Sequence, residues 1–201
     1  MPIKAFVSDF AGVLAEDGLQ KTLGHYAEAR GIPIDSVQEA NRKYWIPFSL
    51  GKISESYYWS RLLGEFGMEG TQVQIKEAQE YLREAHVPYH GMLEFFRSPK
   101  GSRKTGLMTN NTREWLDYFY KKFGLSRIFD VVVSSHECGA RKPSRKIYEI
   151  TLERLGTKAE ETVFIDDQPQ NLEPARQIGM VAVHFESPEQ AIAELKRLAE
   201  A

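Results

Sequence analysis

The sequence has one cysteine, little net charge and no apolar run of about 18 residues. Cys138 cannot form an internal disulfide, and the start MPIKAFVSD shows no charged segment followed by an apolar one, so we expect a cytoplasmic protein. The missing apolar run excludes a membrane-spanning helix of ordinary length. The 26 basic and 28 acidic residues give a formal charge of −2, so we expect neither a nucleic-acid nor a membrane partner.

The chain has 201 residues, of which 42% are hydrophobic, and this is enough to build a core. Short aliphatic runs predict strands with both faces buried, as in a parallel sheet, at residues 3–8, 105–109, 130–134, 162–166 and 180–185. Helical patterns follow the later strands, at residues 111–124, 144–156, 170–179 and 187–201. This alternation predicts an α/β fold with an open, doubly wound parallel sheet.

Residues 16–86 interrupt the alternation, because they contain no convincing strand. They show four amphipathic helical stretches instead, at residues 18–30, 34–46, 54–66 and 71–85. We therefore expect an α/β core formed by residues 1–15 and 87–201, with residues 16–86 as a helical insertion. Its aromatic residues are expected to form the packing core of that insertion; they are Trp45, Tyr57, Tyr58 and Trp59.

Polar side chains gather where the predicted strands end. They are Asp9, Thr109, Asn110, Lys142, Asp166 and Asp167. The carboxyl ends of parallel strands meet at one edge of a sheet, so these residues should converge. Three carboxylates repel one another unless a cation lies between them, and oxygen atoms are the ligands that Mg²⁺ prefers. A metal beside an ammonium and a hydroxyl predicts a phosphate site.

Several of these residues also have simpler interpretations, which the residues alone leave open. Asp167 is suited to cap the helix that follows it. Asn111 is suited to cap its own helix, with Glu114 completing a capping box, and we assign Asn111 no functional role. Lys142 taken alone is compatible with an ordinary solvated lysine.

Four segments resemble the ordered motifs of the haloacid dehalogenase superfamily of hydrolases. They are DFAGVL, LMTNN, ARKPSRKIY and FIDDQPQNLEPARQIGM, between Ile3 and Met180. The set looks similar to the subgroup that contains the phosphatase domain of soluble epoxide hydrolases and bacterial sugar phosphatases. The resemblance implies a Rossmann-like core, a helical cap formed by residues 16–86, and a Mg²⁺-dependent phosphatase acting on a small phosphorylated molecule.

The resemblance also implies a role for each matching residue. Asp9 would attack phosphorus and become an aspartyl phosphate. Thr109, the backbone at Asn110, and Lys142 would bind the phosphoryl group. Mg²⁺ would be held by Asp9, Asp167 and the backbone carbonyl of Ala11, with Asp166 acting directly or through water. A cap that opens and closes would have hinges near residues 14–17 and 86–91.

Ala11 departs from the family pattern, because phosphatases of the family usually have a second Asp at that place, which protonates the leaving oxygen and later activates water. Such acid–base help is typically worth about 10²- to 10⁴-fold. Its loss predicts a slow enzyme, or one restricted to good leaving groups such as sugar 1-phosphates or acyl phosphates. Glu16, Asp17 and His25 are candidate replacements by their proximity in sequence to the cap junction.

Three other functions remain as alternatives. A dehalogenase would also lack the second Asp, but it needs no Mg²⁺ and leaves Asp166 and Asp167 unexplained. A phosphonate hydrolase would resemble DFAGV, and would need Lys43 or Lys52 as a Schiff-base lysine. The third alternative is a binding module that keeps the scaffold without proton transfer.

Overall fold

The fold is built on a five-stranded sheet in which the paired strands are parallel. The computed structural model describes residues 2–98 and 101–200; residues 1, 99–100 and 201 of the predicted core segments lie outside this part. The strand order is β3-β2-β1-β4-β5. The strands are β1 Ala5–Ser8, β2 Lys104–Thr109, β3 Val131–Ser134, β4 Thr162–Asp166 and β5 Val181–His184. The predicted doubly wound α/β fold is confirmed.

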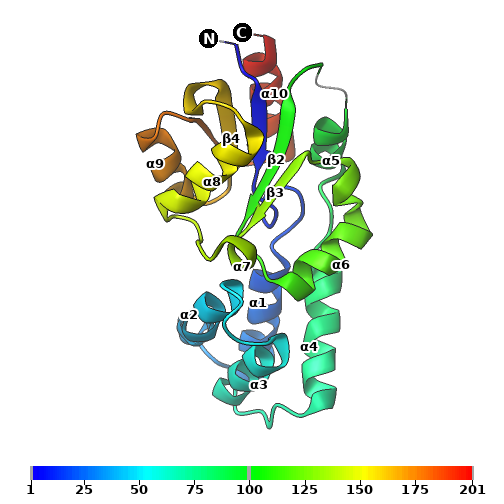
Figure 1. Cartoon of the computed structure of the whole chain (residues 1–201). Coiled ribbons are helices and arrows are strands. Elements are labelled where there is room, and N and C mark those ends of the chain that lie inside the picture. The colour runs from blue at the N-terminus through cyan, green and yellow to red at the C-terminus, as the bar shows by residue number, and fades with distance from the viewer. Residues whose placement is uncertain (1, 99–100, 201) are drawn as a thin grey trace.

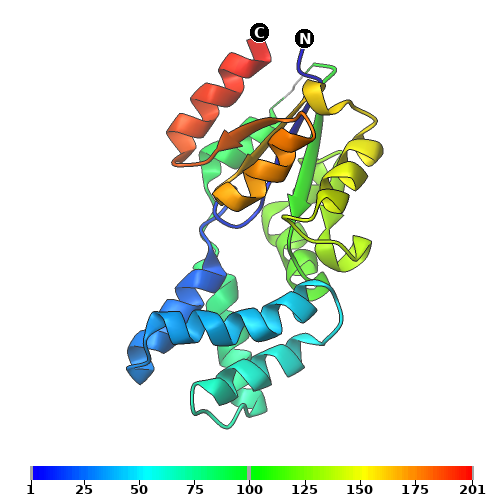
Figure 2. The same ribbon diagram turned by 90° about the vertical axis from the view of Figure 1, so that its left-hand side faces the viewer.

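Helices cover both faces of the sheet, as Figures 1 and 2 show. They are α5 His90–Arg97, α6 Arg113–Phe123, α8 Arg145–Leu155, α9 Pro169–Gln177 and α10 Pro188–Glu200. The short helix α7 Ser135–Cys138 directly follows β3 at the carboxyl end of the sheet (Figure 1). Ala5 and Val7 of β1 pack in the cluster that contains the buried residues of α8 and α9. Phe6, between them, packs in the cluster that contains those of α5, α6 and α10. Successive side chains of a strand point to opposite faces, so each aliphatic strand buries both of its faces.

Four further helices lie beyond the carboxyl ends of the strands, in the lower half of Figure 1. They are α1 Gly18–Arg30, α2 Ile34–Ser49, α3 Glu55–Glu65 and α4 Gln72–Ala85. Local caps set their starts: Ser54 accepts a hydrogen bond from the Tyr57 N–H at 3.2 Å, and Thr71 begins a capping box. Tyr58 and Trp59 are fully buried among these helices, whereas Tyr57 is 51% exposed.

The two segments that join α1–α4 to the sheet lie side by side. Residues 15 and 88 form an antiparallel bridge, and the backbone N–H of Glu16 donates to the carbonyl of Val87 at 2.9 Å. Gly18 packs directly beside His86. A residue with a side chain would not fit there, because its Cβ would lie 2.1 Å from His86 Nδ1. Any hinge at one junction therefore has to move with the other.

The helix boundaries differ from the predicted ones in a few places. α2 continues through Pro47 to Ser49, although we expected it to end at residue 46. Pro47 cannot donate to the carbonyl four residues before it, and the helix ends two residues after this proline. The short helices α5 and α7 were not predicted, because eight and four residues show too little periodicity.

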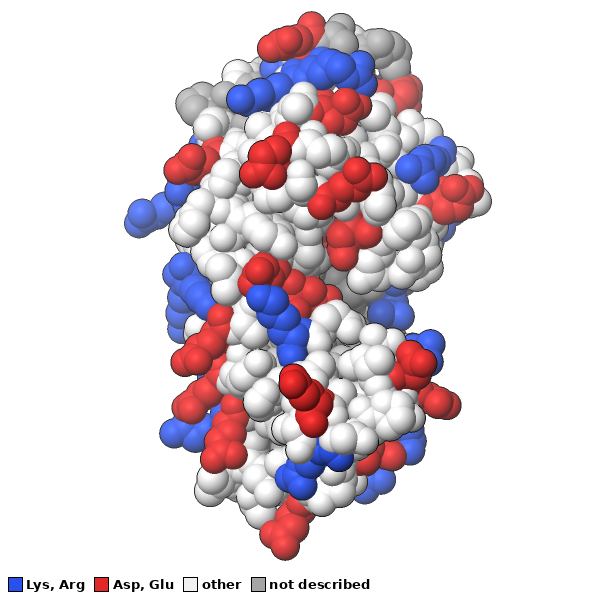
Figure 3. All heavy atoms as spheres, turned by 180° about the vertical axis from the view of Figure 1, so that it is seen from behind, with Lys and Arg blue, Asp and Glu red and all other residues white. Residues whose placement is uncertain are grey.

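Charges of both signs alternate on the rear face of the molecule, and the described residues form no broad area of one sign there (Figure 3). In the described parts of the chain, no helix combines the length and apolar character needed to cross a bilayer.

Candidate active site

Asp9 lies directly after β1, at the carboxyl end of the central strand of the sheet. Its backbone N–H donates to the carbonyl of Ile165 at 2.9 Å, which continues the pairing between β1 and β4. The side chain is buried, and the residue is 7% exposed. The strand pairing therefore fixes where this carboxylate lies.

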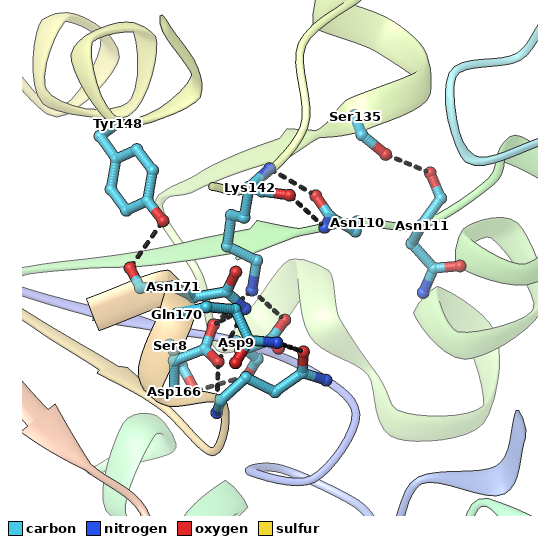
Figure 4. A network of polar contacts seen from close by, with 11 residues as sticks. Ser8, Asp9, Asn110, Asn111, Ser135, Lys142, Tyr148, Asp166, Gln170 and Asn171 are labelled. Carbon is cyan, nitrogen blue, oxygen red and sulfur yellow. Dashed lines mark hydrogen bonds and ion pairs between the residues drawn. The ribbon is translucent and has the colours of Figure 1, made fainter. Parts of the chain in front are cut away.

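Lys142 connects two carboxylates from neighbouring strands (Figure 4). Its Nζ lies 2.7 Å from Asp9 Oδ1 and 2.7 Å from Asp166 Oδ2, and the residue is 1% exposed. Asn110 holds the backbone of this lysine: its amide accepts from the Lys142 N–H at 2.8 Å and donates to the Lys142 carbonyl at 3.0 Å. The interpretation of Lys142 as a solvated lysine is thus wrong.

Asp166 is held by the start of α9. Its Oδ1 accepts from the Gln168 backbone N–H at 2.8 Å and from Asn171 Nδ2 at 2.9 Å. Tyr148 in turn donates its hydroxyl hydrogen to the Asn171 carbonyl at 2.7 Å. Neither Asn171 nor Tyr148 was among the predicted site residues. Asn171 could have been predicted from its position, because it lies five residues after Asp166 at the start of a helix.

Asp167 provides a third carboxylate with an unused oxygen. Its Oδ1 is buried and has no hydrogen-bond partner among the described residues. One carboxylate oxygen each of Asp9, Asp166 and Asp167 lie within 4.8 Å of one another. Gly12 adopts φ +85° beside this group, and a Cβ there would lie 2.5 Å from Asp167 Cγ. An oxygen-rich donor set with an unpartnered buried oxygen fits a hard divalent cation such as Mg²⁺.

The electrostatics of the group favour an added cation. Burial, together with the neighbouring Asp166 and Asp167, raises the pKa of Asp9 to about 8, although Lys142 opposes this rise. Burial and Asp166 likewise raise the pKa of Asp167 to about 6. Burial alone would lower the pKa of Lys142, but Asp166 and Asp9 outweigh it and raise that pKa. One ammonium therefore does not offset three clustered carboxylates.

A cavity of about 220 Å³ opens beside these groups. It is lined by predicted site residues, namely Asp9, Ala11, Thr109, Asn110 and Lys142. Asp17 lines it as well. The other two candidate proton donors have different surroundings: Glu16 forms an ion pair with Lys21, and the His25 ring stacks on Tyr81 at 4.4 Å. The structure therefore brings Asp17, but neither Glu16 nor His25, to the wall of this cavity.

The alternative capping roles do not hold. Gln168 is the N-cap of α9 and no side chain caps it, so Asp167 is not a cap. Thr112 is the N-cap of α6 and accepts from the Trp115 N–H at 3.3 Å, while Asn111 Oδ1 accepts from the Thr112 N–H at 2.9 Å. Asn111 therefore orders the turn before the helix and does not cap it.

Trp45 of α2 contacts aromatic residues of α1–α4 and also one residue of α6, a helix that packs on the sheet. Trp45 packs with Phe48 and Tyr58, as expected of a packing core, but its ring also stacks on Trp115 of α6 at 5.2 Å. Both indoles line the cavity. The aromatic cluster of the insertion is thus also part of the cavity wall.

Comparisons with known proteins place this chain in a family. A family model described as haloacid dehalogenase-like hydrolase matches residues 3–179. Bifunctional epoxide hydrolase 2 of Rattus norvegicus is 29% identical over 220 residues, which cover 98% of this chain and 39% of that protein. The sesquiterpene phosphatase of Aspergillus oryzae is 28% identical over 161 residues, which cover 79% of this chain and 80% of the phosphatase. The chain thus spans about two-fifths of the rat protein and most of the fungal one.

The fold also matches a solved structure. A haloacid dehalogenase family enzyme of Bacteroides thetaiotaomicron, in complex with magnesium and inorganic phosphate, superposes with a TM-score of 0.72 and 19% identity over 92% of this chain and 94% of that one. At this identity the likeness concerns the fold alone. Because the family model extends from the first strand to the end of the last motif, the chain belongs to the haloacid dehalogenase-like hydrolase family.

Proposed function

We propose that this hydrolase is a Mg²⁺-dependent phosphatase that acts on a small phosphate ester through an aspartyl phosphate on Asp9. The observation that carries the proposal is the buried group of three carboxylates around one lysine, in which Asp167 Oδ1 has no partner among the described residues. This arrangement leaves a place for a cation next to a nucleophile. The phosphatase names among the relatives support the same substrate class.

In the first step, an Asp9 carboxylate oxygen forms a bond to phosphorus while the bond from phosphorus to the leaving oxygen breaks. Lys142 orients Asp9 through their 2.7 Å contact and offsets negative charge on the phosphoryl oxygens. Thr109 and the backbone at Asn110 bind those oxygens from the end of β2. In the second step, water attacks phosphorus, and Asp9 is released as a carboxylate with inorganic phosphate.

Asp9, Asp167 and the backbone carbonyl of Ala11 would hold Mg²⁺, with Asp166 acting directly or through water. Bound there, the ion would neutralise the carboxylates and phosphate and keep the nucleophile ionised. Asp166 is already held by Lys142, Gln168 and Asn171, so its orientation does not depend on the metal. Asp166 would therefore keep the same orientation with and without the ion.

Ala11 limits protonation of the leaving oxygen, because its methyl group has no acidic proton to donate. We propose that the enzyme therefore prefers esters whose leaving groups need little protonation, such as sugar 1-phosphates or acyl phosphates. Asp17 is the candidate that lines the same cavity; it is the N-cap of α1, where its Oδ1 accepts from the Gln20 N–H at 3.1 Å. It is the residue we assign to any residual proton transfer there.

The structure offers little support for the other hydrolytic reactions. Carbon–halogen hydrolysis leaves the cluster of Asp166 and Asp167 without a role. Phosphonate cleavage needs a cap lysine in the cavity, but neither Lys43 nor Lys52 is among the described residues that line it. Lys43 instead forms an ion pair with Glu65, which raises its pKa, and a Schiff-base lysine needs the opposite shift.

The test is turnover of an aryl phosphate, whose leaving group needs little protonation, with Mg²⁺ and with a chelator. We expect Mg²⁺-dependent hydrolysis that Asp9→Asn abolishes. Asp35→Asn, which changes an exposed aspartate in α2, is the matched control and should retain the wild-type rate. Absence of turnover on every activated phosphate ester, with Mg²⁺ present, would refute the proposal.

A further inference from the structure

Two arginines that the mechanism does not use line the catalytic cavity. Arg42 comes from α2, and Arg141 comes from the segment just before Lys142. They are far apart in the sequence and reach one cavity from opposite units of the fold. The same cavity contains the nucleophile Asp9, so a substrate that reacts there is within the field of both guanidinium groups.

Arg141 is poorly satisfied within the protein. Its Nε is buried and has no hydrogen-bond partner among the described residues, and no ion pair of Arg141 or Arg42 is found there. Burial lowers the pKa of Arg141 and nothing in the described structure offsets this. A buried donor without an acceptor costs about 1–3 kcal/mol, so such a group indicates a partner that the protein itself does not supply.

Two other arginines of the protein differ from Arg141 in their contacts. Arg145, four positions along the chain, forms an ion pair with Glu149 at 2.7 Å. Arg83, whose Nε is also buried without a partner, lies outside the cavity lining and places its guanidinium over the Tyr118 ring at 5.2 Å. Arg141 has neither kind of contact among the described residues, and of the two arginines with an unpartnered Nε it is the one that lines the cavity.

Part of the wall of the same cavity is aromatic. Trp45 and Trp115 stack at 5.2 Å with an interplanar angle of 25°, and both line the cavity. Trp115 is fixed in place because its Nε1 donates to Glu55 Oε1 at 2.7 Å. A rigid indole surface suits an apolar or planar part of a ligand.

We propose that the substrate is a phosphate ester whose leaving group carries a second anionic group, which Arg141 binds with help from Arg42. The middle of the leaving group lies against Trp45 and Trp115. This inference rests on the phosphatase function proposed above and adds a substrate class to it. The second anion is a carboxylate or another phosphate, since guanidinium binds both through paired N–H donors.

The test compares two aryl phosphates of the same shape, 4-carboxyphenyl phosphate and 4-carbamoylphenyl phosphate, which differ in the charge at the far end. We expect wild-type enzyme to favour the carboxylate in kcat/KM by about 10-fold or more, mainly through KM, because a charge-assisted hydrogen bond of this kind is worth that much. Arg141→Gln should reduce the preference to about one. Arg145→Gln, the matched control, should keep it. A third ester, 1,4-phenylene bisphosphate, shows whether carboxylate or phosphate is preferred.

The two proposals fail in different ways. Turnover of both esters at equal kcat/KM in wild type, or a preference that survives in a folded Arg141→Gln variant, would overturn the second anion site but leave the phosphatase standing. If neither ester is hydrolysed, calorimetric binding of both esters to Asp9→Asn still tests the second anion site. Equal affinities overturn the inference. Tighter binding of the carboxylate ester that is lost with Arg141→Gln supports it. Arg42→Gln provides the same test if Arg141→Gln does not fold.

Discussion

His86 gives the structure a pH dependence whose size can be calculated. The ring is 2% exposed, packs against Phe119 with ring centroids 4.5 Å apart, and places Nδ1 2.8 Å from the Leu82 carbonyl. Burial lowers the pKa of His86 to about 4; the Leu82 carbonyl opposes this and the nearby Lys122 adds to it. The folded protein therefore holds this histidine neutral under conditions in which the unfolded chain protonates it.

The sign of the effect follows from proton uptake. Between the folded pKa of about 4 and the unfolded value of about 6.5, the unfolded chain binds more protons, so unfolding becomes easier as pH falls. The histidine contributes no penalty above the unfolded pKa. From these two pKa values, the free energy of unfolding should drop by about 2 kcal/mol between pH 7 and pH 5, and by about 3 kcal/mol at pH 4.

The assay is urea unfolding of wild type and His86→Gln across this pH range, with chelator present. The carboxylates around Asp9 titrate in both proteins, so their contribution cancels in the difference between the two curves. His90→Gln, which changes an exposed histidine four residues away, is the control and should follow wild type. If His86→Gln loses stability between pH 7 and pH 5 as steeply as wild type, the buried neutral histidine is refuted.

Three further substitutions have defined outcomes. Gly12→Ala should weaken Mg²⁺ activation about 10-fold or more, because its Cβ would lie 2.5 Å from Asp167 Cγ; titration with Mg²⁺ measures this, and Gly64→Ala, with open space at that position, should leave it unchanged. Glu55→Ala should lower the free energy of unfolding by about 1–3 kcal/mol because it leaves the buried Trp115 Nε1 unpaired, whereas Glu55→Gln keeps an acceptor and should cost less in urea unfolding. Ala11→Asp should raise kcat on alkyl phosphates by about 10²-fold and change aryl phosphates much less; equal changes on both would show that protonation of the leaving oxygen was not limiting.

Much of the architecture could be predicted because its determinants are local. The strands are continuous aliphatic runs, and β4 begins and ends at the predicted residues, 162 and 166. Once the sheet is parallel, the positions of Asp9 and Asp166 at one edge follow from strand geometry. The capping residues Ser54 and Thr71 also indicate where their helices start. Each accepts a hydrogen bond from the backbone N–H three residues later, so the signal is local.

The remaining features depend on packing between distant segments. The hydrogen bonds of Asn110 to the Lys142 backbone join residues 32 apart in the chain, and no local pattern encodes them. Arg42 and Arg141 line one cavity because of the way α1–α4 pack against the α/β core. Amphipathic patterns in the sequence do not determine that packing. The division into a core and a cap, and the roles given to individual site residues, stay predictions until variants are measured.

The central claim is that Asp9 receives the phosphoryl group, and acid-quenched protein tests it most directly. Protein mixed with acetyl phosphate and Mg²⁺, quenched in acid and digested, should contain a phosphoryl-sized mass increase on the peptide that bears Asp9. We expect the adduct to disappear with chelator and in Asp9→Asn. Hydrolysis that continues in Asp9→Asn, or an adduct that maps to another residue, would contradict the account.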